Sequence, residues 1–155
     1  MSFDLRNIVK NACVSLTAAA VLLFGGAAFA ADTPDSLKGA ILVDAAKAKS
    51  LSDAGVKVID ARVANEYAES HIKGAVSVPY KEKSAKAADF DASHDSFDLG
   101  KLPADKSTAV VIYCNGAECW KSYKASAVAI KAGYKTVYWF RLGMPEWNAK
   151  GYPTE

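Results

Sequence analysis

From residue 40 onwards, short runs of apolar and β-branched residues recur along the chain. The most continuous of these runs, residues 109–113, shows no alternation of apolar and polar positions. Such a run is typical of a central strand that is covered on both faces. Four further runs of this kind predict strands at residues 40–43, 56–60, 75–78 and 136–140.

Between these runs, apolar residues recur at the spacing of a helix. Helices are predicted over residues 45–53, with Asp44 as N-cap, over 63–70, from Trp120 to a stop at Gly133, and in a short segment that begins at 142–145. Strands that alternate with helices, without a strong hairpin signal, predict an α/β fold with a parallel sheet and helices on both faces.

Residues 81–106 interrupt this alternation. They are rich in Asp, Lys, Ser and Ala and show no strong period. We expect a short helix at residues 83–88, followed by a loop. A loop of this length is often functional or mobile, and a solvated insertion is the simpler interpretation. The sequence leaves the role of this insertion open.

The first 30 residues have the composition of a cleavable signal peptide. Arg6 and Lys10 precede an apolar stretch at residues 12–24, and small residues at positions 28 and 30 predict cleavage before Ala31. The apolar stretch is too short for a confident membrane span, with an uncleaved anchor as the alternative. We therefore expect export to the periplasm without stable membrane insertion, a flexible lead-in at residues 31–39 and one domain at residues 40–155.

The composition fits one globular domain, because 51% of the 155 residues are hydrophobic. Loss of residues 1–30 would leave 17 basic and 16 acidic residues. A charge so close to balance gives no reason to expect nucleic acid as a partner. Of the three cysteines, Cys114 and Cys119 would remain, with His71 and His94 as the only histidines. This set is a poor match to known metal-binding spacings, so we expect no metal and no other cofactor.

Cys114 stands where the most apolar strand is predicted to end. Asn115 and Gly116 follow, and both residue types tolerate a left-handed backbone. A strand end, a tight loop and a helix N-terminus together point several backbone N–H groups into one space, and such a nest favours an anion. We therefore expect the Cys114 thiol to have a lowered pKa and to be nucleophilic near neutral pH.

Three segments resemble the signatures of rhodanese-like domains. Residues 58–79, with the run Val-Ile-Asp-Ala-Arg and the later His-Ile-Lys-Gly-Ala, look like the first signature. Residues 110–120 are similar to the active-site strand and loop, and residues 137–147 to the closing signature. The resemblance implies a central, parallel five-stranded sheet flanked by helices. It also implies that Cys114 carries sulfane sulfur as a persulfide, within a loop formed by Asn115, Gly116, Ala117, Glu118 and Cys119.

The expected chemistry is a sulfur transfer in two steps. The Cys114 thiolate attacks the outer sulfur of thiosulfate, a polysulfide or a persulfide, and a second nucleophile then removes that sulfur. The loop departs from the common family pattern because residues 115–119 contain neither Arg nor Lys, and Lys121 is the nearest cation. We therefore expect anionic donors to bind less well, and we exclude phosphatase chemistry, which uses a longer loop that ends in arginine.

Other residues near the predicted site have more than one interpretation. Cys119 is compatible with a resolving thiol, a disulfide partner of Cys114 or a residue that only packs at the helix start. Asp60 and Arg62 are expected to form a structural ion pair at a strand end. His71 is expected to be structural and His94 solvated. Trp120 is expected in the core or in the wall of a donor site.

These observations predict an exported sulfurtransferase of the rhodanese type. Its partners would be small sulfur donors and a thiophilic acceptor, with a protein acceptor as one possibility. A persulfide carrier with little turnover of its own is one alternative, and the cation-poor loop favours it. A thiol–disulfide redox protein that uses Cys114 and Cys119 is the other. The physiological donor, the acceptor and the oligomeric state are not fixed by the sequence.

Overall fold

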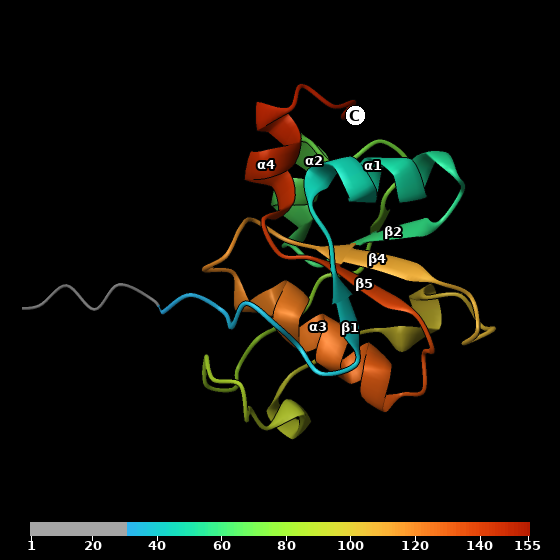
Figure 1. Cartoon of the computed structure of the whole chain (residues 1–155). Helices are drawn as coiled ribbons and strands as arrows, with labels where there is room; N and C mark the ends of the chain where they lie inside the picture. Colours follow the sequence, from blue (N-terminus) through green and yellow to red (C-terminus); the bar gives the residue numbers. More distant parts are fainter. Residues whose placement is uncertain (1–30) are drawn as a thin grey trace, which may run out of the picture.

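The structure is a computed structural model that describes residues 31–155 (Figure 1). The predicted signal peptide at residues 1–30 lies outside the described residues. Five strands were found close to their predicted positions: β1 (Ala40–Leu42), β2 (Lys57–Asp60), β3 (Val76–Ser77), β4 (Val110–Tyr113) and β5 (Val137–Phe140). The described part of the chain contains no helix that is long and apolar enough to cross a membrane.

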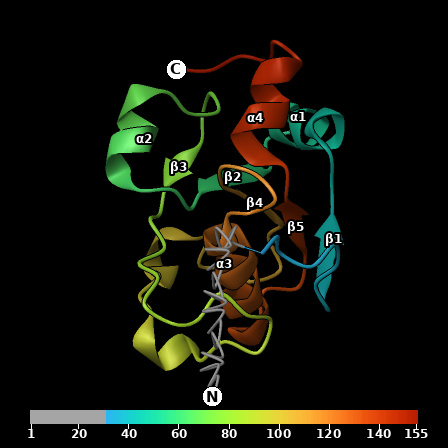
Figure 2. The same ribbon diagram turned by 90° about the vertical axis from the view of Figure 1, so that its left-hand side faces the viewer.

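All five strands run parallel in one sheet with the order β1-β5-β4-β2-β3, which Figure 2 shows from right to left. Strand β4 is central and all four of its residues are buried. Its register pairs Ile112 with Ile59 of β2 and with Trp139 of β5. The continuous apolar run at residues 109–113 is thus explained by a strand that packs on both faces.

Helices cover both faces of the sheet, as predicted. Helices α1 (Ala45–Asp53), α2 (Ala64–Glu69) and α4 (Gly143–Ala149) lie above the sheet in Figures 1 and 2, and α3 (Trp120–Lys131) lies below it. Two main apolar clusters fill the space between the layers, one on each side of the sheet. The fold is therefore a three-layer α/β arrangement in which the carboxyl ends of β2, β4 and β5 meet at one edge.

The insertion at residues 81–106 differs from the prediction. Residues 83–88 form no helix, and the only helical turns are two short 3₁₀ segments, η1 (Ala92–His94) and η2 (Leu99–Lys101). Ser84 donates hydrogen bonds from its backbone N–H and from its hydroxyl to the Asp95 carboxylate, at 2.7 and 2.6 Å. Such side-chain contacts compete with helical hydrogen bonds, which is why the helix-compatible composition does not produce a helix here.

Candidate active site at the end of strand β4

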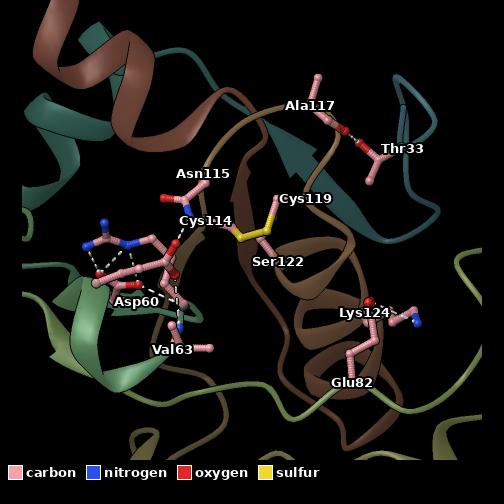
Figure 3. The surroundings of a disulfide bond; sticks show 12 residues. Thr33, Asp60, Val63, Glu82, Cys114, Asn115, Ala117, Cys119, Ser122 and Lys124 are labelled. Carbon is pink, nitrogen blue, oxygen red and sulfur yellow. Dashed lines mark hydrogen bonds and ion pairs between the residues drawn. A yellow bond between two sulfur atoms is a disulfide. The ribbon is translucent and has the colours of Figure 1, made fainter. Parts of the chain in front are cut away.

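Cys114 directly follows β4 and is fully buried, with an exposed fraction of 0%. Its sulfur forms a disulfide with Cys119, the residue at the N-cap of α3, and the two Cα atoms are 6.3 Å apart (Figure 3). This Cα separation lies within the range that a disulfide bridges. Of the three roles that the sequence left open for Cys119, the structure shows the disulfide. Cys119 is only partly buried, so the two sulfurs differ in their access to solvent.

The loop between the two cysteines keeps its backbone N–H groups available. The Cys119 N–H donates to the Gly116 carbonyl at 3.1 Å and closes a turn. Within residues 31–155, the N–H groups of 115–118 donate to no other residue. Free donors next to a cysteine are what the nest predicted from the sequence requires, and a nest of this kind stabilises negative charge on sulfur. The Asn115 side chain is used elsewhere, because its amide donates to Glu66 Oε1 at 2.6 Å.

The carbonyl group of Cys114 is fixed by the start of α4. The Met144 N–H donates to the Cys114 carbonyl oxygen at 3.0 Å. Gly143 has a φ of +52°, and a Cβ atom at this position would overlap that same oxygen. A glycine is therefore required here for two reasons, namely the left-handed backbone and the close approach to Cys114. The sequence marked Gly143 only as part of a signature, and the contact with Cys114 depends on tertiary structure.

Asp60 and Arg62 form the ion pair that we predicted. Both are buried, and the Arg62 guanidinium contacts Asp60 Oδ2 at 2.6 Å and Oδ1 at 3.0 Å. The Tyr113 hydroxyl, on the residue before Cys114, donates to the same carboxylate. Burial, and then the negative charge of Asp60, raise the pKa of the Tyr113 phenol, so this group stays protonated and remains a donor. The network therefore fixes the end of β4 and does not contribute a nucleophile or a base.

The lead-in at residues 31–39 contacts the loop, although we predicted a flexible segment. Thr33 is 2% exposed, and both its N–H and its hydroxyl donate to the Ala117 carbonyl, at 2.8 and 2.7 Å. The Arg141 guanidinium donates to the Thr33 carbonyl at 2.6 Å, and Trp120 Nε1 donates to the Ala31 carbonyl at 2.8 Å. The polar composition of the segment gave no sign of these partners, which lie 84 or more positions away in the chain.

One surface pocket reaches the cysteine loop, and a second lies at the first turn of α3. One, of about 360 Å³, is lined by the Asn115 side chain together with Arg62, Glu66, Glu69, Ser70, Met144, Pro145 and Asn148. The other, of about 400 Å³, is lined by Lys121 together with Val63, Ala64, Pro79, Tyr80, Lys81 and Glu82. The loop residue Glu118 is exposed. The pockets thus contain the cations Arg62, which is paired with Asp60, and Lys81 and Lys121, but each pocket also contains glutamate.

The remaining candidates have structural positions. His71 stacks on Tyr67 with ring centroids 3.6 Å apart, and its Nδ1 lies 2.8 Å from the Tyr67 carbonyl oxygen. His94 is exposed on η1. Trp120 is buried against Tyr123 and Trp139. Among residues 31–155, no three His, Cys, Asp or Glu side chains are grouped in a way that could hold a metal ion. The nucleophilic side chains at the end of β4 are those of the cysteine pair.

Sequence reasoning missed one buried charge near this region. Lys124, on α3, is fully buried and its Nζ lies 3.0 Å from Glu82 Oε2, in an ion pair. The same Nζ donates to the hydroxyl and to the carbonyl of Ser84, at 2.9 and 3.1 Å. It also lies 5.2 Å from the centroid of the Phe90 ring. The only signal in the sequence was that Lys124 occupies one of the positions of α3 that are otherwise apolar.

Comparisons with known proteins agree with this geometry. The family profile described as rhodanese-like domain matches residues 43–150. A solved rhodanese-like domain from the Anabaena sp. Alr3790 protein is 28% identical, with a TM-score of 0.53, over 74% of this chain and 77% of that one. The thiosulfate sulfurtransferase of Pseudomonas aeruginosa shares the fold, with 23% identity and a TM-score of 0.57, over 76% of this chain and 20% of that one.

A curated relative is the HTH-type transcriptional regulator Rv0324 of Mycobacterium tuberculosis, which is 31% identical over 100 residues. The match covers 64% of this chain but only 38% of the regulator, so the likeness concerns one part of that protein. The family profile, by contrast, covers most of this chain and includes the β4 strand, the cysteine loop and Gly143. The chain therefore belongs to the rhodanese-like domain family.

Proposed function

We propose that the protein is an exported sulfurtransferase that moves sulfane sulfur through a persulfide on Cys114. The observation that carries the proposal is the placement of Cys114 beside four backbone N–H groups, at residues 115–118, that bond to no other described residue. Membership of the family supports the same reaction class. The predicted signal peptide supports a periplasmic location.

The reaction requires no separate base. In its reduced form, the Cys114 thiolate attacks the outer sulfur of a donor such as thiosulfate, a Cys–S–S⁻ group forms, and sulfite leaves with the electron pair of the cleaved S–S bond. The nest stabilises the negative charge of the persulfide. A thiophilic acceptor, such as cyanide, then attacks the outer persulfide sulfur and regenerates the thiolate.

The charges around the site bear on the choice of donor. The loop contains Glu118 and no cation, and the pocket lined by Asn115 contains Glu66 and Glu69 beside Arg62. A compact dianion such as thiosulfate gains little from such surroundings. We therefore propose that donors with less charge at the reacting end, such as persulfides and organic thiosulfonates, react more efficiently than thiosulfate.

The experiment compares the wild-type chain with Cys114→Ser and Cys119→Ser, each reduced with a dithiol and then freed of it. We expect the intact mass of Cys119→Ser to show sulfur uptake at Cys114, and thiocyanate to form when wild type or Cys119→Ser reacts with the donor in the presence of cyanide. Cys114→Ser is expected to take up none. The proposal is refuted if neither wild type nor Cys119→Ser gains sulfur from thiosulfate, a thiosulfonate or a persulfide. Uptake without transfer to cyanide would support the carrier alternative.

A second candidate function is thiol–disulfide exchange, and the Cys114–Cys119 disulfide is the observation that favours it. In this case the pair would exchange electrons with an external dithiol and no sulfur substrate would be involved. The two candidates differ in one measurement, because only the sulfurtransferase forms a cyanide-labile persulfide on Cys114. The five-residue spacing of the pair is wider than the CxxC motif of common disulfide oxidoreductases.

A further inference from the structure

We infer that Cys119 is a resolving thiol that attacks the Cys114 persulfide, so that the protein reduces sulfane sulfur to hydrosulfide with a dithiol as electron source. The inference rests on the proposed function for the first step, in which Cys114 takes up sulfur. It goes further in assigning Cys119 a reaction, a product and a class of co-substrate.

The fold brings the two sulfur atoms within bonding distance. In the described structure the sulfur of Cys119 is bonded to the sulfur of Cys114, with the β4 end, the loop and the start of α3 all in place (Figure 3). Attack on a persulfide at Cys114 would form this same bond. The product geometry is therefore one that the fold accommodates, with Cα atoms 6.3 Å apart.

Cys119 occupies the N-cap position of α3. This helix is 12 residues long, and no side chain caps its first turn. The unpaired N–H groups and the positive end of the helix dipole stabilise negative charge placed there. Cys119 is thus in a position that suits a sulfur nucleophile.

The reaction balances without a further reagent in the resolving step. The Cys119 thiolate attacks Cys114 Sγ, the inner sulfur of the persulfide, and the Cys114–Cys119 bond forms. The bond between Cys114 Sγ and the outer sulfur breaks, and the outer sulfur leaves with the electron pair and takes up a proton as HS⁻. The two thiols are oxidised to the disulfide, and one sulfane sulfur is reduced to sulfide.

Regeneration requires two electrons, which we assign to an external dithiol. Cys114 is fully buried and Cys119 is only partly buried, so the dithiol reaches Cys119 first. Attack at Cys119 Sγ forms a mixed disulfide and releases Cys114 as a thiolate into the nest of N–H groups, which makes it a good leaving group. The second thiol of the dithiol then attacks the mixed disulfide and releases the Cys119 thiolate. The dithiol leaves as its own disulfide.

The test uses an arenethiosulfonate as sulfur donor, because its leaving group is a sulfinate and any sulfide then comes from the transferred sulfur. Reduced wild type, without free dithiol, receives one equivalent of donor. We expect one sulfide per chain, loss of both thiols and no retained sulfur. Cys119→Ser and Cys119→Ala are expected to retain the sulfur as a persulfide and to release at least ten-fold less sulfide. Addition of dithiothreitol should make sulfide release by wild type catalytic.

The outcomes separate this inference from the proposed function. If wild type holds the sulfur as a stable persulfide while Cys119 remains a free thiol, the resolving role is wrong and the sulfurtransferase remains. If sulfide release by Cys119→Ser equals that of wild type, the resolving role is also wrong. If neither protein takes up sulfur, the proposed function itself fails. If the Cys119 variants fold poorly, the number of sulfides released and thiols lost per wild-type chain still decides whether Cys119 is a resolving thiol.

Discussion

Within residues 31–155, charged side chains are buried in two networks, and the two are built differently. At the site, Asp60 and Arg62 are both buried, lie two positions apart and reach the end of β4 through Tyr113. In the insertion, Asp95 collects hydrogen bonds from Tyr80, Lys83 and Ser84, and Ser84 in turn binds the buried Lys124 of α3. The first network holds the end of β4, directly before the cysteine loop, and the second attaches residues 81–106 to α3. Loss of the first should affect stability and chemistry together, whereas loss of the second should affect mainly the insertion.

The largest effect is expected for Asp60→Ala. It leaves the Arg62 guanidinium buried without its carboxylate, and breaking a buried ion pair in this way costs about 3–5 kcal/mol. Chemical denaturation should show this loss in the free energy of unfolding, and sulfur uptake by the folded fraction should fall as well. The control is Asp60→Ala combined with Arg62→Met, which removes both charges and should recover part of the stability. A double variant no more stable than Asp60→Ala would contradict the ion-pair explanation.

Gly143→Ala should come next, with its main effect on the site. A left-handed backbone costs a non-glycine residue about 1–2 kcal/mol, and at Gly143 the added Cβ also overlaps the Cys114 carbonyl oxygen. Gly151→Ala is the matched control, because Gly151 has a φ of +65° but no atom within 4 Å of an added Cβ. Only Gly143→Ala should slow sulfur uptake by Cys114, measured in single-turnover assays. Equal uptake rates in the two variants would show that the contact is unimportant.

Lys124→Met tests the insertion network alone. Methionine keeps most of the side-chain volume but leaves Glu82 and Ser84 without the buried ammonium, at a cost of about 1–3 kcal/mol. Limited proteolysis should cut residues 81–106 faster, while sulfur uptake at Cys114 should stay within two-fold of wild type. Lys131→Met, at an exposed position at the end of the same helix, serves as the control. A large loss of uptake in Lys124→Met would mean that the insertion is part of the site.

The smallest effect is a pH dependence centred on Asp95. Burial alone would raise the pKa of Asp95, but hydrogen bonds from Ser84, from the Lys83 N–H and from Tyr80 outweigh it and hold the pKa well below its ordinary value. A carboxyl group with a lowered pKa in the folded state stabilises the fold above its unfolded pKa of about 3.9. This contribution is lost as the pH falls below that value towards the folded pKa.

Acid should therefore expose the insertion to proteolysis, and Asp95→Asn should reproduce part of the effect at neutral pH, at about 1–2 kcal/mol. An acid-stable protease can follow the cleavage of residues 81–106 between pH 5 and pH 2, which brackets the reference value of about 3.9. Wild type should become more sensitive over this interval, and Asp95→Asn should show a weaker pH response. Identical acid profiles for the two proteins would remove Asp95 from the explanation.

The same contrast explains which features could be predicted from the sequence. The strands, the cap at Asp44 and the Asp60–Arg62 pair depend on residues close together in the chain, and the structure confirms them. Lys124 and Asp95 were missed because their partners lie 11 or more positions away, across a segment without a period. The contact of Gly143 with Cys114 likewise depends on the parallel pairing of β4 with β5, which brings the ends of these strands together.

The composition of the insertion also misled the helix prediction. Residues 83–88 contain good helix formers, but the Ser84 and Lys83 N–H groups find a better acceptor in Asp95. The disulfide between Cys114 and Cys119 could be predicted only as one of several alternatives. The spacing of Cys114 and Cys119 allowed it, but spacing alone could not separate it from two other roles, because the conformation of the intervening loop decides the distance.

The contacts of the lead-in have a practical consequence for anyone who prepares the protein. The family match begins at residue 43 and ends at 150, yet Thr33 holds the Ala117 carbonyl and Glu155 exchanges backbone hydrogen bonds with His71. A fragment cut to the matched range would lack these contacts and also strand β1. An affinity tag fused directly before residue 33 would be placed beside the cysteine loop. Assays of sulfur chemistry are therefore best run on a chain that retains residues 31–155. Any tag should be separated from the chain end by a spacer.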